Sequence, residues 1–139
     1  MKKILFVALA FNMLFSFACS KRDNQVLVRF QNSTNADIKE ARMEFDSMNT
    51  TNLGLIPADA TTGYFVFDYF EAGSYFGGDH LIPMGRLNGE INGEDLAAWS
   101  LNWCGTGMEY KQLEPGKYTI EIVKAGSDSP WAYQIMFVE

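Results

Sequence analysis

The stretch of sequence that decides the fold is Leu113-Glu114-Pro115-Gly116-Lys117-Tyr118. Pro115 presets the first central φ of a tight turn, and Gly116 can adopt the positive φ that the second central position requires. Beyond the turn, residues 118–122 alternate between apolar and polar, which is the pattern of a half-buried β-strand. The stretch therefore predicts a turn and a strand, with one further strand, 131–138, after it.

The spacing Leu-x-Pro-Gly-x-Tyr resembles the tyrosine corner of Greek-key β-sandwiches. In that motif a tyrosine at the start of the penultimate strand donates a hydrogen bond from its hydroxyl back across the corner. Tyr118 stands at the matching position, because a single strand follows its own. The resemblance implies an all-β fold, a single antiparallel β-sandwich of about seven strands. It leaves immunoglobulin-like and transthyretin-like topologies open.

Alternation and turn signals predict the other strands. Ala41, Met43 and Phe45 face one way while the polar residues between them face the other. Residues 62–70 are apolar on both faces, so this strand is either covered by loops, which we favour, or meets a partner. No sustained 3.6-residue stripe is present, and only 94–99 has a composition that suits a helical turn. The predicted strands are 26–31, 41–46, 62–70, 80–87, 96–103, 117–124 and 131–138.

The first eighteen residues predict a cleaved export signal. Lys2 and Lys3 precede a 15-residue apolar run, 4–18, that ends on the small residue Ala18. Such a run is shorter than the roughly 20 residues of a permanent membrane span. Removing this segment leaves 121 residues, which is one domain's length. We expect residues 19–24 to be a tether and 25–139 to be the β-sandwich domain.

Cys19, which follows Ala18 directly, resembles the lipobox cysteine of bacterial lipoproteins, whose thiol receives a diacylglycerol. Ser16 and Phe17 depart from the usual lipobox residues. Ser16 and Ala18 also suit an ordinary signal peptidase, which would cut the same bond and add no lipid. The resemblance implies lipidation of Cys19, with palmitate among the acyl chains, and a location in the cell envelope, at the outer membrane.

The charge of the chain restricts its partners. The net charge is −6, and it becomes −8 when Lys2 and Lys3 leave with the signal. An acidic domain of this kind is not expected to bind nucleic acid or to adhere directly to anionic lipid headgroups. The membrane is instead reached through the lipid on Cys19, and an envelope protein or a glycan remains a candidate partner.

The sequence offers little chemistry for catalysis. His80 is the one histidine, so a hydrolase would have to use it with acidic neighbours. We expect Cys104 to be a small buried residue. The alternatives are a disulfide with an unlipidated Cys19 and a reactive thiol. Residues 88–99 resemble a calcium loop, but position one is Asn88 and position twelve is Trp99, which favours a hairpin with two Asn-Gly turns. We expect a non-enzymatic protein with no cofactor and no metal.

The three tryptophans and one serine are the remaining candidates. Trp99, Trp103 and Trp131 could form a ligand face, because indole rings stack on the apolar faces of sugars, although a sandwich core also needs a tryptophan. Trp99 and Trp103 would share a face of one strand. Ser47, within Asp46-Ser47-Met48, resembles the Bacteroidetes acceptor for protein O-glycosylation.

The whole chain resembles the small envelope lipoproteins of Bacteroidetes-type bacteria that carry one β-sandwich. The resemblance rests on the export signal, the Asn-rich loop after Phe30 and the corner at Tyr118. It implies a lipid-anchored binding or interaction module and supplies no catalytic residues. A carbohydrate-binding surface lipoprotein is the alternative function, and an envelope hydrolase is a third.

Overall fold

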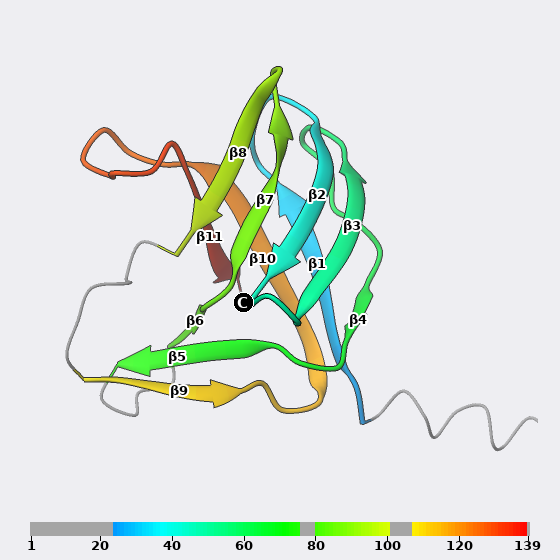
Figure 1. The fold of residues 1–139 in the computed structure, drawn as a ribbon, viewed down its shortest axis with the longest axis vertical. Helices are drawn as coiled ribbons and strands as arrows, with labels where there is room; N and C mark the ends of the chain where they lie inside the picture. Colours follow the sequence, from blue (N-terminus) through cyan, green and yellow to red (C-terminus); the bar gives the residue numbers. More distant parts are fainter. Residues whose placement is uncertain (1–23, 76–79, 101–106, 139) are drawn as a thin grey trace, which may run out of the picture.

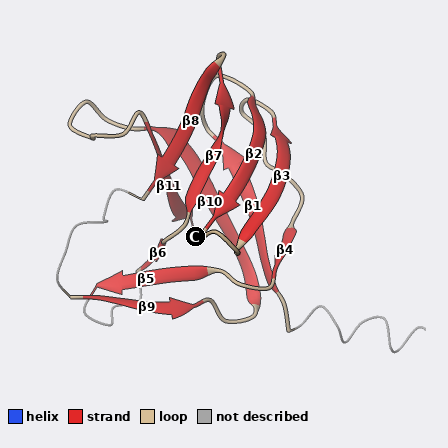
Figure 2. Cartoon of the chain, in the orientation of Figure 1, coloured by secondary structure: helices blue, strands red, loops and turns tan. Residues whose placement is uncertain are grey.

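The computed structural model describes residues 24–75, 80–100 and 107–138. Their regular structure consists of eleven β-strands, and these ranges contain no helix (Figure 2). The prediction of an all-β fold is confirmed. The search of the described residues for a helix able to cross a membrane finds none.

Eight strands form one mixed sheet in the order β3-β2-β7-β8-β11-β10-β1-β4, which curls until it nearly closes into a barrel (Figure 1). β1 pairs with β10 and β8 pairs with β11 in parallel, whereas the other neighbours are antiparallel. The bounds are β1 Val26–Asn32, β2 Ile38–Glu44, β3 Thr50–Ile56, β4 Phe65–Phe67, β7 Arg86–Ile91, β8 Glu94–Trp99, β10 Gly116–Lys124 and β11 Tyr133–Val138.

Three short strands form a second, antiparallel sheet across one end of the curled sheet (Figure 1). β5 (Glu71–Tyr75) lies between β6 (Leu81–Pro83) and β9 (Met108–Gln112). Next to this sheet, the ring of Phe70 lies 4.7 Å from that of Phe45 and 5.0 Å from that of Phe67. Because Phe70 directly precedes β5, these aromatic contacts hold the start of β5 against the main core.

The predicted seven-strand antiparallel sandwich was wrong in strand number and in pairing. Residues 62–70 contain only the three-residue β4, and Val66 in it is 48% exposed, so loops do not cover its outer face. Residues 80–87 divide between β6 and β7, and 94–99 form β8 rather than a helical turn. Strands β3, β5 and β9 were not predicted.

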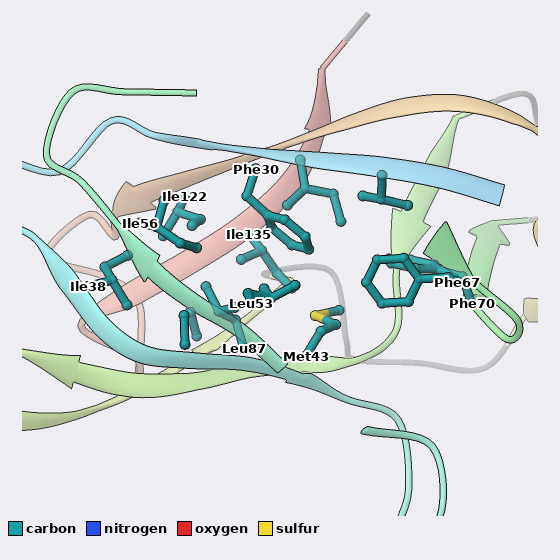
Figure 3. Close-up of a cluster of buried hydrophobic side chains, with 14 of the residues drawn as sticks. Phe30, Ile38, Met43, Leu53, Ile56, Phe67, Phe70, Leu87, Ile122 and Ile135 are labelled. Carbon is teal, nitrogen blue, oxygen red and sulfur yellow. The ribbon is translucent and has the colours of Figure 1, made fainter. Parts of the chain in front are cut away.

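The predicted alternation is confirmed in β1 and β2. Val26, Val28 and Phe30 are buried, and the residues between them are partly exposed. In β2, Ala41 and Met43 are buried while Arg42 is exposed. The inward side chains of β1, β10 and β11 pack against those of β2, β3 and β7, which forms one core between two walls of the curled sheet (Figure 3).

The tyrosine corner is present. The Tyr118 hydroxyl donates a hydrogen bond to the Glu114 carbonyl oxygen at 3.0 Å. The positive φ expected at Gly116 is wrong, because this residue is the first of β10 and pairs with Val26. A Cβ at this position would make only an ordinary contact, 3.4 Å from the Tyr118 ring, so neither packing nor φ requires glycine there.

The side chain of Asn32 fastens the ends of the curled sheet together. Asn32 ends β1 and is fully buried. Its Nδ2 donates to the carbonyl oxygens of Ala36, Ile56 and Pro57 at 2.9, 3.1 and 3.1 Å, and its Oδ1 accepts from the N–H and hydroxyl of Thr34. Since Ile56 ends β3, these bonds join the sheet's first strand in order to its next-to-last.

Only one of the two predicted Asn-Gly turns forms. Asn92 and Gly93, with φ of 54° and 80°, make the two-residue turn between β7 and β8. Gly89 lies within β7, opposite an irregularity in β2, where a Cβ would lie 2.8 Å from the Lys39 carbonyl oxygen. The glycine therefore admits a close approach of two backbones.

Candidate functional site

Polar and aromatic side chains form a row on the outer face of β2, β7 and β8 and on the loop that precedes β11. Glu44 pairs with Arg86 in the β2–β7 register, and Trp99 lies beside Arg86 on the next strand. Their neighbours Met43, Leu87 and Ala98 are buried in the core, so the row faces away from it. We call Glu44, Arg42, Arg86, Asn88, Trp99 and Trp131 the ladder face.

The polar half of the ladder face consists of Glu44, Arg42, Arg86 and Asn88, and the Glu44 carboxylate is at its centre. It accepts from Arg42 Nε at 2.7 Å, from Arg86 at 2.9 Å and from Asn88 Nδ2 at 2.6 Å. Burial raises the pKa of Glu44, but the hydrogen bonds and charges of Arg86 and Arg42 outweigh it and hold the pKa below its usual value. Both guanidiniums are thereby fixed in position while nearly half of each side chain stays exposed.

The aromatic half of the ladder face, Trp99 and Trp131, adjoins the polar half at Arg86. The guanidinium carbon of Arg86 lies 5.5 Å from the centre of the Trp99 ring, a cation–π contact. The Trp99 ring lies 6.0 Å from that of Trp131, at 37° between the planes. Trp131 is 41% exposed and belongs to the loop between β10 and β11. Two of the three candidate ligand residues, Trp99 and Trp131, therefore lie side by side, and their role in binding stays a prediction.

A groove of about 500 Å³ runs beside this row. It connects the ladder face to the turn between β2 and β3, and its lining residues are Glu44, Phe45, Asp46, Ser47, Thr50, Met84, Arg86 and Trp99. Asp46 shapes the turn by accepting from the Met48 and Asn49 N–H groups, and a further hydrogen bond from the Asn49 side chain is the largest cause of its lowered pKa. Ser47 is exposed at the rim.

Several predicted residues lie elsewhere. Cys19, Trp103 and Cys104 lie outside the described residues, so their roles stay predictions. His80 is exposed at the start of β6, and within the described ranges it makes no hydrogen bond or ion pair. Among those same residues, no three histidine, cysteine or acidic side chains gather in a way that would hold a metal ion.

The polar half of the ladder face was not predicted as a site. The alternation in 41–46 placed Arg42 and Glu44 on a wet face, but nothing in the sequence joined them to Arg86 and Asn88, more than forty residues away. Asn88 was predicted as a turn residue, whereas it is a buried strand residue that donates to Glu44.

The arrangement combines a stacking surface with fixed donors. The Trp99–Trp131 pair offers apolar ring surface, and the guanidiniums beside it present N–H groups held in place by Glu44. The ladder face and the Asp46 turn carry two cations and two carboxylates, so they have no net charge. A ligand with an apolar face and several hydroxyl groups suits such a site.

The fold and the site define an all-β domain with a polar and aromatic face on its large curled sheet. No family model matches the sequence, and no curated protein matches it either. A solved structure, an NMR structure of a protein from Eubacterium rectale, is similar over 87% of this chain and 95% of its own, with a TM-score of 0.52 and 11% identity. At that identity the likeness concerns the fold alone.

Proposed function

We propose that this protein is a lipid-anchored envelope protein that binds carbohydrate on the ladder face. The observation that carries the proposal is the contact between Trp99 and the exposed Trp131, beside guanidiniums fixed by Glu44. The C–H groups of a pyranose stack on an indole ring, and its hydroxyls accept hydrogen bonds from arginine N–H groups. The two cations of the ladder face are balanced by Glu44 and by Asp46 of the adjacent turn, which favours neutral sugars.

A glycan panel with fluorescence detection tests the proposal. We expect neutral glycans to shift the tryptophan emission, and we expect Trp131→Ala to weaken binding by about tenfold, because stacked aromatic rings are frequent hot spots. Tyr110→Ala is the matched control, since Tyr110 is a 58% exposed aromatic residue on β9. Equal loss in both variants, or an unchanged spectrum across the whole panel, would contradict the assignment.

The anchor is tested separately. We propose that Cys19 carries the lipid and that the domain is held at the outer membrane. Metabolic labelling with a fatty-acid analogue should label the wild type and not Cys19→Ala. Label that survives the substitution, or no label on the wild type, would refute the anchor without affecting the sugar site.

Two finer expectations belong to the same proposal. The first is O-glycosylation of Ser47, which is supported by the exposure of this residue on the turn between β2 and β3. Loss of a sugar mass in Ser47→Ala, but not in Ser127→Ala, is the expected result. A relationship to immunoglobulin-like or transthyretin-like sandwiches is supported by the Tyr118 corner.

A further inference from the structure

A second outward surface, on β4, β1 and β10, is basic and partly apolar. In the register, Leu27 lies between Val66 on β4 and Lys117 on β10. Arg29 lies on the same side of β1, two residues further along. Tyr64 precedes β4 and is 41% exposed, and Val66 is 48% exposed. We call Leu27, Arg29, Tyr64, Val66 and Lys117 the basic face.

The two cations of the basic face share one aromatic ring. The Arg29 guanidinium carbon lies 5.3 Å from the centre of the Tyr64 ring, and the Lys117 ammonium lies 5.7 Å from it. Arg29 Nε donates to the Thr119 hydroxyl at 2.9 Å. Among the described residues, neither cation forms an ion pair with a carboxylate. Their charge is therefore uncompensated at short range.

Among the described residues, acidic side chains flank this surface at its two ends. Glu121 is further along β10, where it accepts from Ser33 and Gln31. Asp68 and Glu114 line a groove at the opposite end, where the chain enters β1. The positive charge is consequently concentrated at the middle of the face, around Tyr64.

The basic face lies close to the proposed anchor. Residues 20–25 separate Cys19 from Val26, and six residues span at most roughly 20 Å. The strand that leaves this tether is β1, which is the middle strand of the basic face. The ladder face is on the other wall of the curled sheet, since the core separates β1 and β10 from β2 and β7 (Figure 3).

We propose that the basic face rests on the anionic headgroups of the membrane that holds the lipid. This inference rests on the proposed anchor. The net charge of −8 led us to expect no adhesion to anionic lipid, but the distribution of charge decides orientation. A membrane of negative surface potential attracts Arg29 and Lys117, which lie together around the Tyr64 ring, and repels the acidic groups of the domain. Val66, Leu27 and Tyr64 add apolar contact at the interfacial level.

This orientation has a direct consequence for the sugar site. With β1 toward the lipid, the ladder face on β2, β7 and β8 points away from the membrane. A glycan on the far side then reaches Trp131 without competing with headgroups.

Vesicle flotation of the Cys19→Ala chain tests the face without the lipid. Vesicles of equal parts phosphatidylglycerol and phosphatidylcholine are compared with pure phosphatidylcholine at low ionic strength. We expect flotation with the anionic vesicles only. Each cation near such a surface contributes about a fivefold change in partitioning, so Arg29→Glu with Lys117→Glu should reduce it by about 30-fold or more. Lys39→Glu with Lys111→Glu, two exposed lysines elsewhere, is the charge-matched control.

The outcomes separate this inference from the anchor. Equal losses in the two double variants, flotation with neutral vesicles, or no flotation at all would overturn the basic face as a membrane contact. Because the tested chain has no Cys19 thiol, none of these results depends on lipidation.

Hydrogen exchange on the lipidated protein provides a second readout. On anionic vesicles, we expect added protection in β4 and β1 relative to the same protein in detergent, and none in β2. Protection confined to β2 and β7 would place the ladder face on the membrane and refute the orientation.

Discussion

Replacing Asn32 should destabilise the domain more than any other single polar substitution in its loop. Its carboxamide has two N–H groups, which are shared among three carbonyl oxygens, and its oxygen accepts two further bonds from Thr34. Asn32→Ala therefore removes about four hydrogen bonds. At roughly 1 kcal/mol each, and with the Ile56 carbonyl left in a dry place, the loss is about 3–5 kcal/mol.

Urea unfolding followed by circular dichroism measures this loss. Thr34→Val removes only the hydroxyl bonds and should cost about 1 kcal/mol, so it keeps the reasoning testable if Asn32→Ala does not fold. Asn35→Ala is the control, because Asn35 is exposed in the same loop and should change stability by less than about 0.5 kcal/mol. A loss below about 1 kcal/mol for Asn32→Ala would show that the sheet does not depend on this side chain for its closure.

Two further predictions concern the ladder face and the strand beneath it. Because its folded-state pKa is lowered, Glu44 contributes stability above the unfolded-state pKa of about 4.3, and this is lost as the pH falls through the folded-state value. Glu44→Gln should therefore cost about 1 kcal/mol at neutral pH and flatten the acid limb of a thermal-unfolding pH profile, which the exposed Glu94→Gln should leave unchanged. Gly89→Ala should lower the free energy of unfolding by about 1–3 kcal/mol, seen as a lower urea midpoint, because its Cβ would meet the Lys39 carbonyl oxygen at 2.8 Å. An unchanged midpoint would contradict this prediction, because it would mean that β2 can move away from the new Cβ with no loss of folding free energy.

The sequence predicts strands where alternation is undisturbed. Residues 26–31 and 117–124 are strongly patterned, and both strands were predicted within two residues of their bounds. The missed strands break the pattern for identifiable reasons. β3 contains Gly54 at a φ of 73°, β5 contains Gly73 packed under two methionine sulfurs, and β9 is almost wholly exposed. Their local composition is typical of loops, and only pairing with neighbours makes them strands.

The residues of the ladder face were also hard to predict, because the contacts between them depend on strand pairing. The spacing of Trp99 and Trp103 predicted a shared face, which lies partly outside the described residues, and nothing in the sequence indicated the contact between Trp99 and Trp131. That contact arises because β8 and β11 are parallel neighbours, and parallel pairing joins segments that no local pattern connects. The assembly of Glu44, Arg86 and Asn88 depends likewise on the β2–β7 register.

The parallel pairing of β1 with β10 also governs when the molecule can fold. Arg29 meets Thr119, ninety residues later, so the first strand finds its central partner only when nearly the whole chain is available. Until then β1 lacks its partner β10, and closing a loop of about ninety residues is slow. For the proposed export, this means that a chain threaded amino end first through a translocation pore could not complete its large sheet until the passage had ended.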